Sequence, residues 1–239
     1  MKLIVMCIIF TISASCFCFA VDKTPQPLPF PKGKDIDRII KRNNLQQEGR
    51  KLAEYGRYEE ALDKYRSAMD PSLLNNDGDR SNPLCSIRDI YKYQGKFKEA
   101  LELNEKEIVP RNPDKDEYVE ASMELRALIR SSDMKNYKPI YDYIAYLKDK
   151  DGKRRFGPDS HVDTMIFLYD YMKDYDSGIM LMEDLIKYHT QHPNANHRSA
   201  NAKRVKEYQR VKEAWELDKK TGKHGHLQEV IRTSDIIGW

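Results

Sequence analysis

Residues 49–71 read GRKLAEYGRYEEALDKYRSAMDP, and the architecture expected for the rest of the chain follows from them. Apolar and small residues recur at helical spacing on both sides of Gly56, which predicts two short amphipathic helices joined by a tight turn. Gly56 suits the left-handed conformation that ends a first helix. Ala61 is small, so the two helices can approach closely where they cross. The stretch therefore predicts a helical hairpin that ends before Pro71.

The same pattern returns further along the chain. Residues 96–102, KFKEALE, repeat residues 57–63, RYEEALD, almost position for position. An aromatic residue is expected at the start of each second helix, with successive separations of 39, 40 and 38 residues: Tyr58, Phe97, Tyr137 and Tyr175. Near-constant spacing is what stacked repeats require, and one hairpin alone cannot bury its apolar face. We therefore expect four hairpins over residues 35–193.

The third and fourth hairpins keep the helical pattern but not the full signature. Ile140 stands where the third hairpin should have a small residue at the crossing of its helices. Gly178 restores a small residue at that place in the fourth. Gly95 in the second hairpin corresponds to Gly56 in the first, and both should end their helices in the left-handed conformation.

The order of small and aromatic residues in the first hairpin resembles a tetratricopeptide (TPR) repeat, a helix-turn-helix unit of about 34 residues. The residues that carry the resemblance are Gly49, Gly56, Tyr58, Ala61, Tyr65, Ala68 and Pro71. It implies an all-α chain: a right-handed α-solenoid of about four TPR-like hairpins with a C-terminal capping helix. The separations of 38–40 residues exceed the TPR period, so we expect extra length in the loops at 75–82 and 150–159.

Proteins that this chain resembles bind a segment of a partner protein in the concave groove lined by their first helices. Carried over by position, from offsets to Gly49, Tyr91 and Tyr169, the resemblance implies a partner-binding groove. Mixed charge with aromatic rings suits a peptide ligand. The predicted groove residues are Arg50, Glu54, Asp89, Lys92, Tyr93, Phe167, Asp170 and Tyr171.

Residues 1–20, MKLIVMCIIFTISASCFCFA, have the pattern of a secretory signal peptide, and cleavage is expected before Val21. The apolar run is too short to span a membrane. An alternative is that residues 13–16, Ser-Ala-Ser-Cys, act as a lipobox with Cys16 lipidated, and an uncleaved anchor is a third possibility. Residues 21–34 contain four prolines and should form an extended linker.

Cleavage at that point leaves a mature chain with Cys85 as its one cysteine. No internal disulfide can then form, so the fold must be stable through packing alone. Cys85 falls in the first turn of an expected helix, where a small buried residue is more typical than a reactive thiol.

Residues 194–239 should form a capping helix and a tail. An apolar stripe predicts a long helix over residues 200–220, ended by Gly222, and a short turn of helix is possible at 227–232. The basic residues of the long helix form either a solvated face or a docking surface. The tail either folds back on the scaffold or is presented to a partner. The stripe consists of Ala202, Val205, Tyr208, Val211 and Trp215.

Nothing in the sequence points to catalysis, a cofactor or a metal. The formal net charge of +3 is too small to suggest a nucleic acid or a membrane surface as a partner. No nucleotide-binding or nucleophile motif occurs, and the histidines do not have the spacing of a metal site. Five of the six histidines follow the fourth hairpin or lie in the tail, at His189, His192, His197, His224 and His226.

The resemblance thus implies a non-catalytic scaffold or adaptor of the bacterial cell envelope, periplasmic or secreted, that binds a protein or peptide. One alternative is an outer-membrane lipoprotein subunit of a secretion or envelope-assembly complex, acylated at Cys16. Another is a glycan-binding accessory protein, for which an aromatic-lined groove would be the mark.

Overall fold

A computed structural model describes residues 33–112, 115–153, 161–192 and 198–233. Within these ranges the chain is helical and contains no strand, which confirms the all-α prediction. The predicted signal peptide, the lipobox and most of the proline-rich linker lie outside the described residues. None of the described helices is long and apolar enough to cross a membrane.

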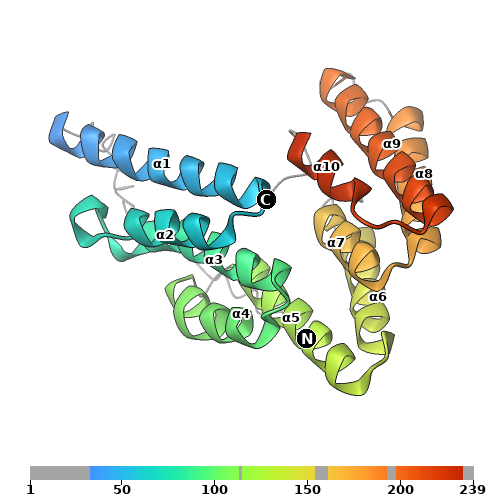
Figure 1. The fold of residues 1–239 in the computed structure, drawn as a ribbon, viewed down its shortest axis with the longest axis horizontal. Helices are drawn as coiled ribbons and strands as arrows, with labels where there is room; N and C mark the ends of the chain where they lie inside the picture. The colour runs from blue at the N-terminus through green and yellow to red at the C-terminus, as the bar shows by residue number, and fades with distance from the viewer. Residues whose placement is uncertain (1–32, 113–114, 154–160, 193–197, 234–239) are drawn as a thin grey trace, which may run out of the picture.

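The helices follow one another along an open arc, with α1 at one end, α5 and α6 at its bend, and α8 and α9 at the other end (Figure 1). Four hairpins pair α1 with α2, α3 with α4, α5 with α6 and α7 with α8, while α2 packs on α3 and α4 packs on α5. The helices are α1 Gly33–Glu54, α2 Tyr58–Ala68, α3 Ser81–Tyr93, α4 Phe97–Leu103, α5 Asp116–Met134, α6 Lys138–Lys153, α7 Val162–Met172, α8 Tyr175–Gln191, α9 Arg198–Thr221 and α10 His226–Thr233.

The four hairpin turns have the same backbone geometry. Gly56 and Gly95 have φ of 72° and 73°, as predicted, and Lys135 and Lys173 take the same left-handed conformation in the later hairpins, with φ of 52° and 56°. In each turn the following residue donates its N–H to the carbonyl five positions earlier, as in a Schellman motif. These bonds are Arg57 to Leu52 (2.9 Å), Lys96 to Tyr91 (2.8 Å), Asn136 to Ser131 (3.2 Å) and Asp174 to Tyr169 (3.1 Å).

Small residues lie where the first two hairpins need them. Ala61 and Ala100 are fully buried, and so is Ile140 in the third. Gly178 also has a contact that was not predicted from the sequence. Its close neighbour is the indole of Trp215 on α9, because a Cβ at Gly178 would lie 2.6 Å from a ring carbon of that side chain. The glycine therefore makes room for the capping helix.

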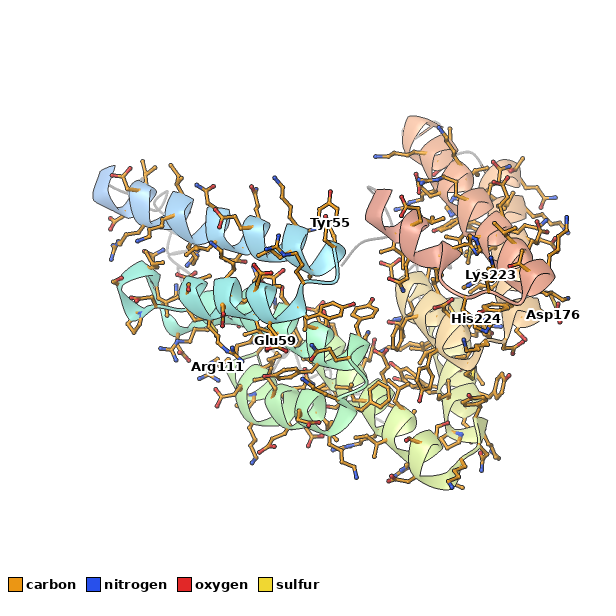
Figure 2. All side chains as sticks on the ribbon, in the orientation of Figure 1. Tyr55, Glu59, Arg111, Asp176, Lys223 and His224 are labelled. Atoms are coloured by element: carbon orange, nitrogen blue, oxygen red, sulfur yellow. The ribbon has the colours of Figure 1, made fainter. Side chains whose placement is uncertain are left out.

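The second hairpin departs from a regular α-helix. After α4 the chain continues as a π-helical turn over Asn104–Ile108 and a 3₁₀ turn over Val109–Arg111. The wide turn coincides with the buried amide of Asn104, which donates to the carbonyl of Tyr118 (2.7 Å) and to the hydroxyl of Ser122 (2.9 Å) on α5. Arg111, labelled in Figure 2, then pairs with the carboxylate of Asp77 at 2.8 Å. Local sequence gave no signal for this turn.

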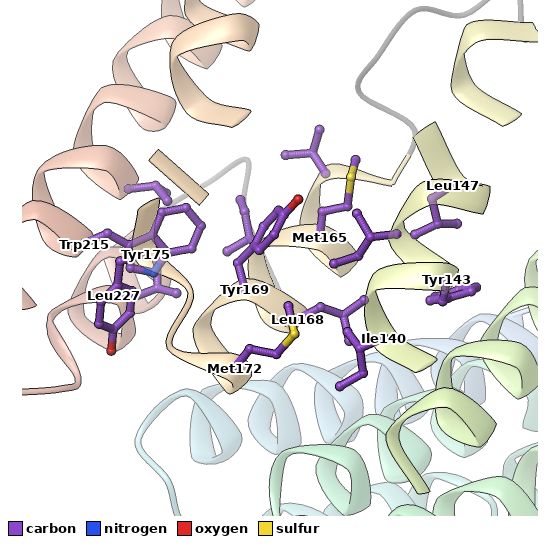
Figure 3. Packing of buried hydrophobic residues seen from close by; sticks show 14 of the residues in the cluster. Ile140, Tyr143, Leu147, Met165, Leu168, Tyr169, Met172, Tyr175, Trp215 and Leu227 are labelled. Carbon is purple, nitrogen blue, oxygen red and sulfur yellow. The ribbon is translucent and has the colours of Figure 1, made fainter. Parts of the chain in front are cut away.

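The C-terminal helices complete the main hydrophobic core. Tyr208, Val211 and Trp215 of α9 are buried against α8, whereas Ala202 is exposed, so the predicted stripe holds for the second half of the helix. Gly222 ends α9 with φ of 66°, as expected. One cluster of buried residues runs from α4 to α10, and Figure 3 shows part of it, from Leu147 and Tyr143 on one side to Trp215 and Leu227 on the other.

Cys85 provides a test of the packing of α3, because it lies against the buried cluster of Leu84, Ile108 and Tyr118. Its side chain is partly buried at the start of α3, and burial raises the pKa of its thiol. We therefore expect a mature chain that begins at Val21 to react with Ellman's reagent at least about tenfold more slowly when folded than in denaturant, because the thiolate is the reactive species. Stopped-flow absorbance measures both rates. Equal rates would contradict this packing of α3.

Candidate functional site

Side chains from α3, α5 and α7 converge on Lys92. Its Nζ lies 3.1 Å from Oε1 of Glu124 on α5 and 4.6 Å from the ring centre of Phe167 on α7. The ring of Tyr93 meets Phe167 edge to face, with centroids 5.1 Å apart. We call Lys92, Tyr93, Glu124 and Phe167 the Lys92 cluster. It joins three first helices that are far apart in the sequence.

The charges in the Lys92 cluster are held in a dry environment. The side chains of Lys92 and Glu124 are only 12% and 7% exposed. Burial by itself would lower the pKa of Lys92, but the attraction of the carboxylates of Glu124 and Asp89 outweighs it and raises this pKa above its usual value. Burial raises the pKa of Tyr93 to about 12, so its phenol is neutral at physiological pH. The cluster therefore holds a paired cation on an aromatic ring, a contact worth up to about 2 kcal/mol when desolvated.

A hollow of about 600 Å³ adjoins this cluster on the N-terminal half of α5. We call it the acidic pocket, because four carboxylates and one lysine line it together with polar groups from α6 and α7. Asp116 and Glu117 are exposed, whereas Glu120 and Glu124 are buried. The lining residues are Lys115, Asp116, Glu117, Glu120, Ala121, Glu124, Tyr143, His161 and Thr164.

Each buried glutamate of the pocket has a basic partner. Glu120 forms an ion pair with Lys150 of α6 and lies 3.6 Å from Nδ1 of His161. The hydroxyl of Tyr143 donates to the backbone carbonyl of Glu120 at 3.1 Å, and burial raises the pKa of this phenol. A buried carboxylate is tolerated only when it is paired and hydrogen-bonded. The ion pairs with Lys150 and Lys92 meet this requirement for Glu120 and Glu124 at the wall of the pocket.

The structure brings four of the eight predicted groove residues together. Lys92, Tyr93 and Phe167 belong to the Lys92 cluster. Tyr171 extends it, because its ring stacks with that of Phe167 at 6.3 Å and meets Phe97 edge to face at 5.6 Å.

The other four predicted residues form their polar contacts outside this set, although Asp170 lines a small hollow together with Tyr93 and Phe167. Asp170 accepts a hydrogen bond from the indole of Trp215 at 3.2 Å, and burial raises the pKa of its carboxyl. Asp89 pairs with its neighbour Arg88 at 2.8 Å. Arg50 and Glu54 pair with each other on α1, at 3.0 Å.

Glu120 and Glu124, the two buried glutamates of the acidic pocket, were not among the residues predicted from the sequence. Glu120 and Glu124 are four residues apart and in line with Leu128, so they fall on the face of α5 that packs against the rest of the chain. Charged residues on a buried helix face indicate a buried polar site, so the spacing of Glu120, Glu124 and Leu128 could have predicted this one. Tyr143 and His161 gave no comparable signal, because they reach the pocket from α6 and from the residue before α7.

Most of the histidines have packing partners. His189 is buried between the rings of Tyr188 and Tyr208. His224 meets the hydroxyl of Tyr175 at 2.6 Å, and His226 lies against the carboxylate of Asp218. Among the described residues, no three or more metal-binding side chains gather closely enough to hold an ion, and His197 lies outside the described residues.

No protein-family model matches the chain, and no curated protein or solved structure shows significant similarity to it. The function is therefore inferred from the geometry of the acidic pocket and the Lys92 cluster.

Proposed function

We propose that this protein is a non-catalytic scaffold that binds a segment of a partner protein on the inner surface formed by α3, α5 and α7. The observation that carries the proposal is the acidic pocket beside the Lys92 cluster. Carboxylates at the pocket suit the ammonium or guanidinium group of a partner's lysine or arginine. The adjoining rings suit the aliphatic stem of the same side chain or a neighbouring apolar residue. The proposed ligand is therefore a basic polypeptide segment.

The proposal includes a right-handed solenoid of TPR-like hairpins. Two features support it. The four turns share one backbone geometry, and the first helices α3, α5 and α7 contribute side chains to one surface. In stacked hairpins the first helices line the inner side of the array, which is where a partner segment binds.

Selection from a displayed library of random peptides tests the binding site. We expect the protein to enrich peptides that contain lysine or arginine, and the double variant Asp116→Lys, Glu117→Lys to bind them at least about tenfold more weakly. These two residues are exposed at the pocket, so reversing their charge leaves the buried pairs intact. Fluorescence polarisation with synthesised peptides gives the dissociation constants.

The matched control reverses two charges elsewhere. Glu59 and Glu99 stand in the first turns of α2 and α4, as Asp116 and Glu117 do in α5, so lysine there has the same unfavourable interaction with the helix dipole. The variant Glu59→Lys, Glu99→Lys should bind like the unaltered protein. No enrichment of basic peptides, or equal loss in both double variants, would contradict the proposal.

We also propose that the chain is exported and acts in the bacterial cell envelope. The support is the signal-peptide pattern of residues 1–20. Mass spectrometry of the mature N-terminus tests this directly. A chain that begins at Val21 is the expected result, an acylated chain that begins at Cys16 would favour the lipoprotein alternative, and an intact Met1 would contradict cleavage.

A further inference from the structure

Helix α10 lies on the inner side of the arc, next to α7 (Figure 1). Its residues face Tyr93 on α3 and Phe167 and Asp170 on α7, all three of which were predicted to bind a partner. The space left between the helices is only about 20 Å³, little more than one water molecule requires. The chain's own C-terminal helix therefore covers this end of the surface closely.

Three apolar side chains hold α10 in place. Leu227 is 1% exposed, Val230 is buried, and Ile231 packs against the main core. Their spacing of three and four residues puts them on one face of the helix. An eight-residue helix is not stable in water by itself, so α10 is helical because it is docked. Figure 3 shows Leu227 beside Trp215 and Tyr175.

A short, well-anchored turn connects α10 to α9. Gly222 and Gly225 both have positive φ, 66° and 118°, and reverse the chain direction. The buried carboxylate of Asp218 accepts the backbone N–H groups of Gly225 and His226, each at 3.4 Å. Figure 2 labels Lys223 and His224 in this turn. So short a tether keeps α10 at a local concentration on the order of millimolar, which lets even weak contacts favour docking.

We infer that α10 is a built-in occupant of the partner-binding surface and competes with the partner for it. This inference rests on the proposed function and adds to it the shape of the ligand. Because α10 fits this end of the surface, the bound part of the partner is an amphipathic helix with apolar residues at the spacing of Leu227, Val230 and Ile231. Partner binding displaces α10, which swings away on the turn at 222–225.

The test uses the full chain and a fluorescent peptide of residues 222–233. The variant Leu227→Asp, Ile231→Asp should release α10 and bind the peptide at least about tenfold more tightly than the unaltered protein, whose site is filled. Adding Phe167→Ala to the released variant should remove that binding. Leu217→Asp on α9 is the matched control, because Leu217 is 41% exposed and its replacement should change nothing. Equal peptide binding by the released variant and the unaltered protein would overturn the inference.

Hydrogen exchange on the unaltered protein keeps the inference testable if the released variant does not fold. Backbone amides of α10 should exchange at least about tenfold faster than those of α8 and α9, because α10 opens without global unfolding. Excess peptide of residues 222–233 should speed their exchange further by taking the place of α10. Protection of α10 equal to that of α9 would show a permanent part of the core and would overturn the inference.

Failure of this inference can be told apart from failure of the proposed function. If the released variant binds its own α10 peptide but library selection yields no basic peptide, α10 does cover a binding surface while the proposed basic ligand is wrong. If selected peptides bind the unaltered and released proteins equally, the scaffold function stands and competition by α10 is refuted.

Discussion

Replacing Glu124 with glutamine should lower the free energy of unfolding by about 3–5 kcal/mol, the typical effect of removing one partner of a buried ion pair. The change leaves Lys92, which is 12% exposed, without its carboxylate inside the protein. Equilibrium unfolding in urea, followed by circular dichroism, measures the loss. Because the pKa of Lys92 is raised, the stabilisation by this pair is complete below the ordinary lysine pKa of about 10.4, and it is lost as the pH rises from there through the raised value.

Two further variants show whether the loss comes from the uncompensated charge. Lys92→Met combined with Glu124→Leu should recover most of the stability, because an apolar pair of similar volume is often neutral or better. Asp142→Asn removes one partner of an ion pair whose side chains are 74% and 63% exposed, and should change stability by no more than about 1 kcal/mol. If Glu124→Gln were as mild as Asp142→Asn, the Lys92 cluster would not be the dry site described above.

The elements that sequence reasoning located correctly are those whose signals are local. Gly56 and Gly95 mark the first two turns because a left-handed residue in a helix end favours glycine. The last two turns have the same geometry at Lys135 and Lys173, so the repeat signature fades there although the backbone does not change. Glycine in the signature lowers the conformational cost of the left-handed turn. The hairpins can nevertheless form without it, as Lys135 and Lys173 show.

The candidate site was only partly predictable, because its key contacts join distant parts of the chain. The predicted positions Lys92, Tyr93 and Phe167 do meet, but Glu124, their ionic partner, is 32 residues from Lys92 and belongs to a helix for which no groove residue was predicted. The Arg50–Glu54 pair lies on α1, in the hairpin that best preserves the signature. Predicting a residue's role from its distance in sequence to a repeat position identifies the helix face on which the residue lies. Which side chains meet across helices depends on how the hairpins stack.

Alanine at Gly178 should destabilise the protein, although the same change in an ordinary helix interior stabilises by roughly 1 kcal/mol. The opposite sign is expected because the new Cβ would lie 2.6 Å from a ring carbon of Trp215, which is fully buried. Overpacking of this kind costs about 1–3 kcal/mol. Thermal unfolding of the full chain measures it, and a stabilised Gly178→Ala variant would contradict the packing of α9 on α8.

Substitution of Trp215, the partner of Gly178 in this contact, should destabilise the protein more than Gly178→Ala does. Trp215→Ala should cost about 3–5 kcal/mol, since it leaves a cavity in the main core and also removes the hydrogen bond from the indole to Asp170. Trp215→Phe keeps most of the ring and loses the donor, so it isolates the hydrogen bond at about 1–3 kcal/mol. Gly178→Ala combined with Trp215→Leu should cost less than the sum of the single changes, because the smaller side chain removes the clash that the methyl group creates. Strict additivity would mean that the two residues do not touch, and α9 would then need another position over α8.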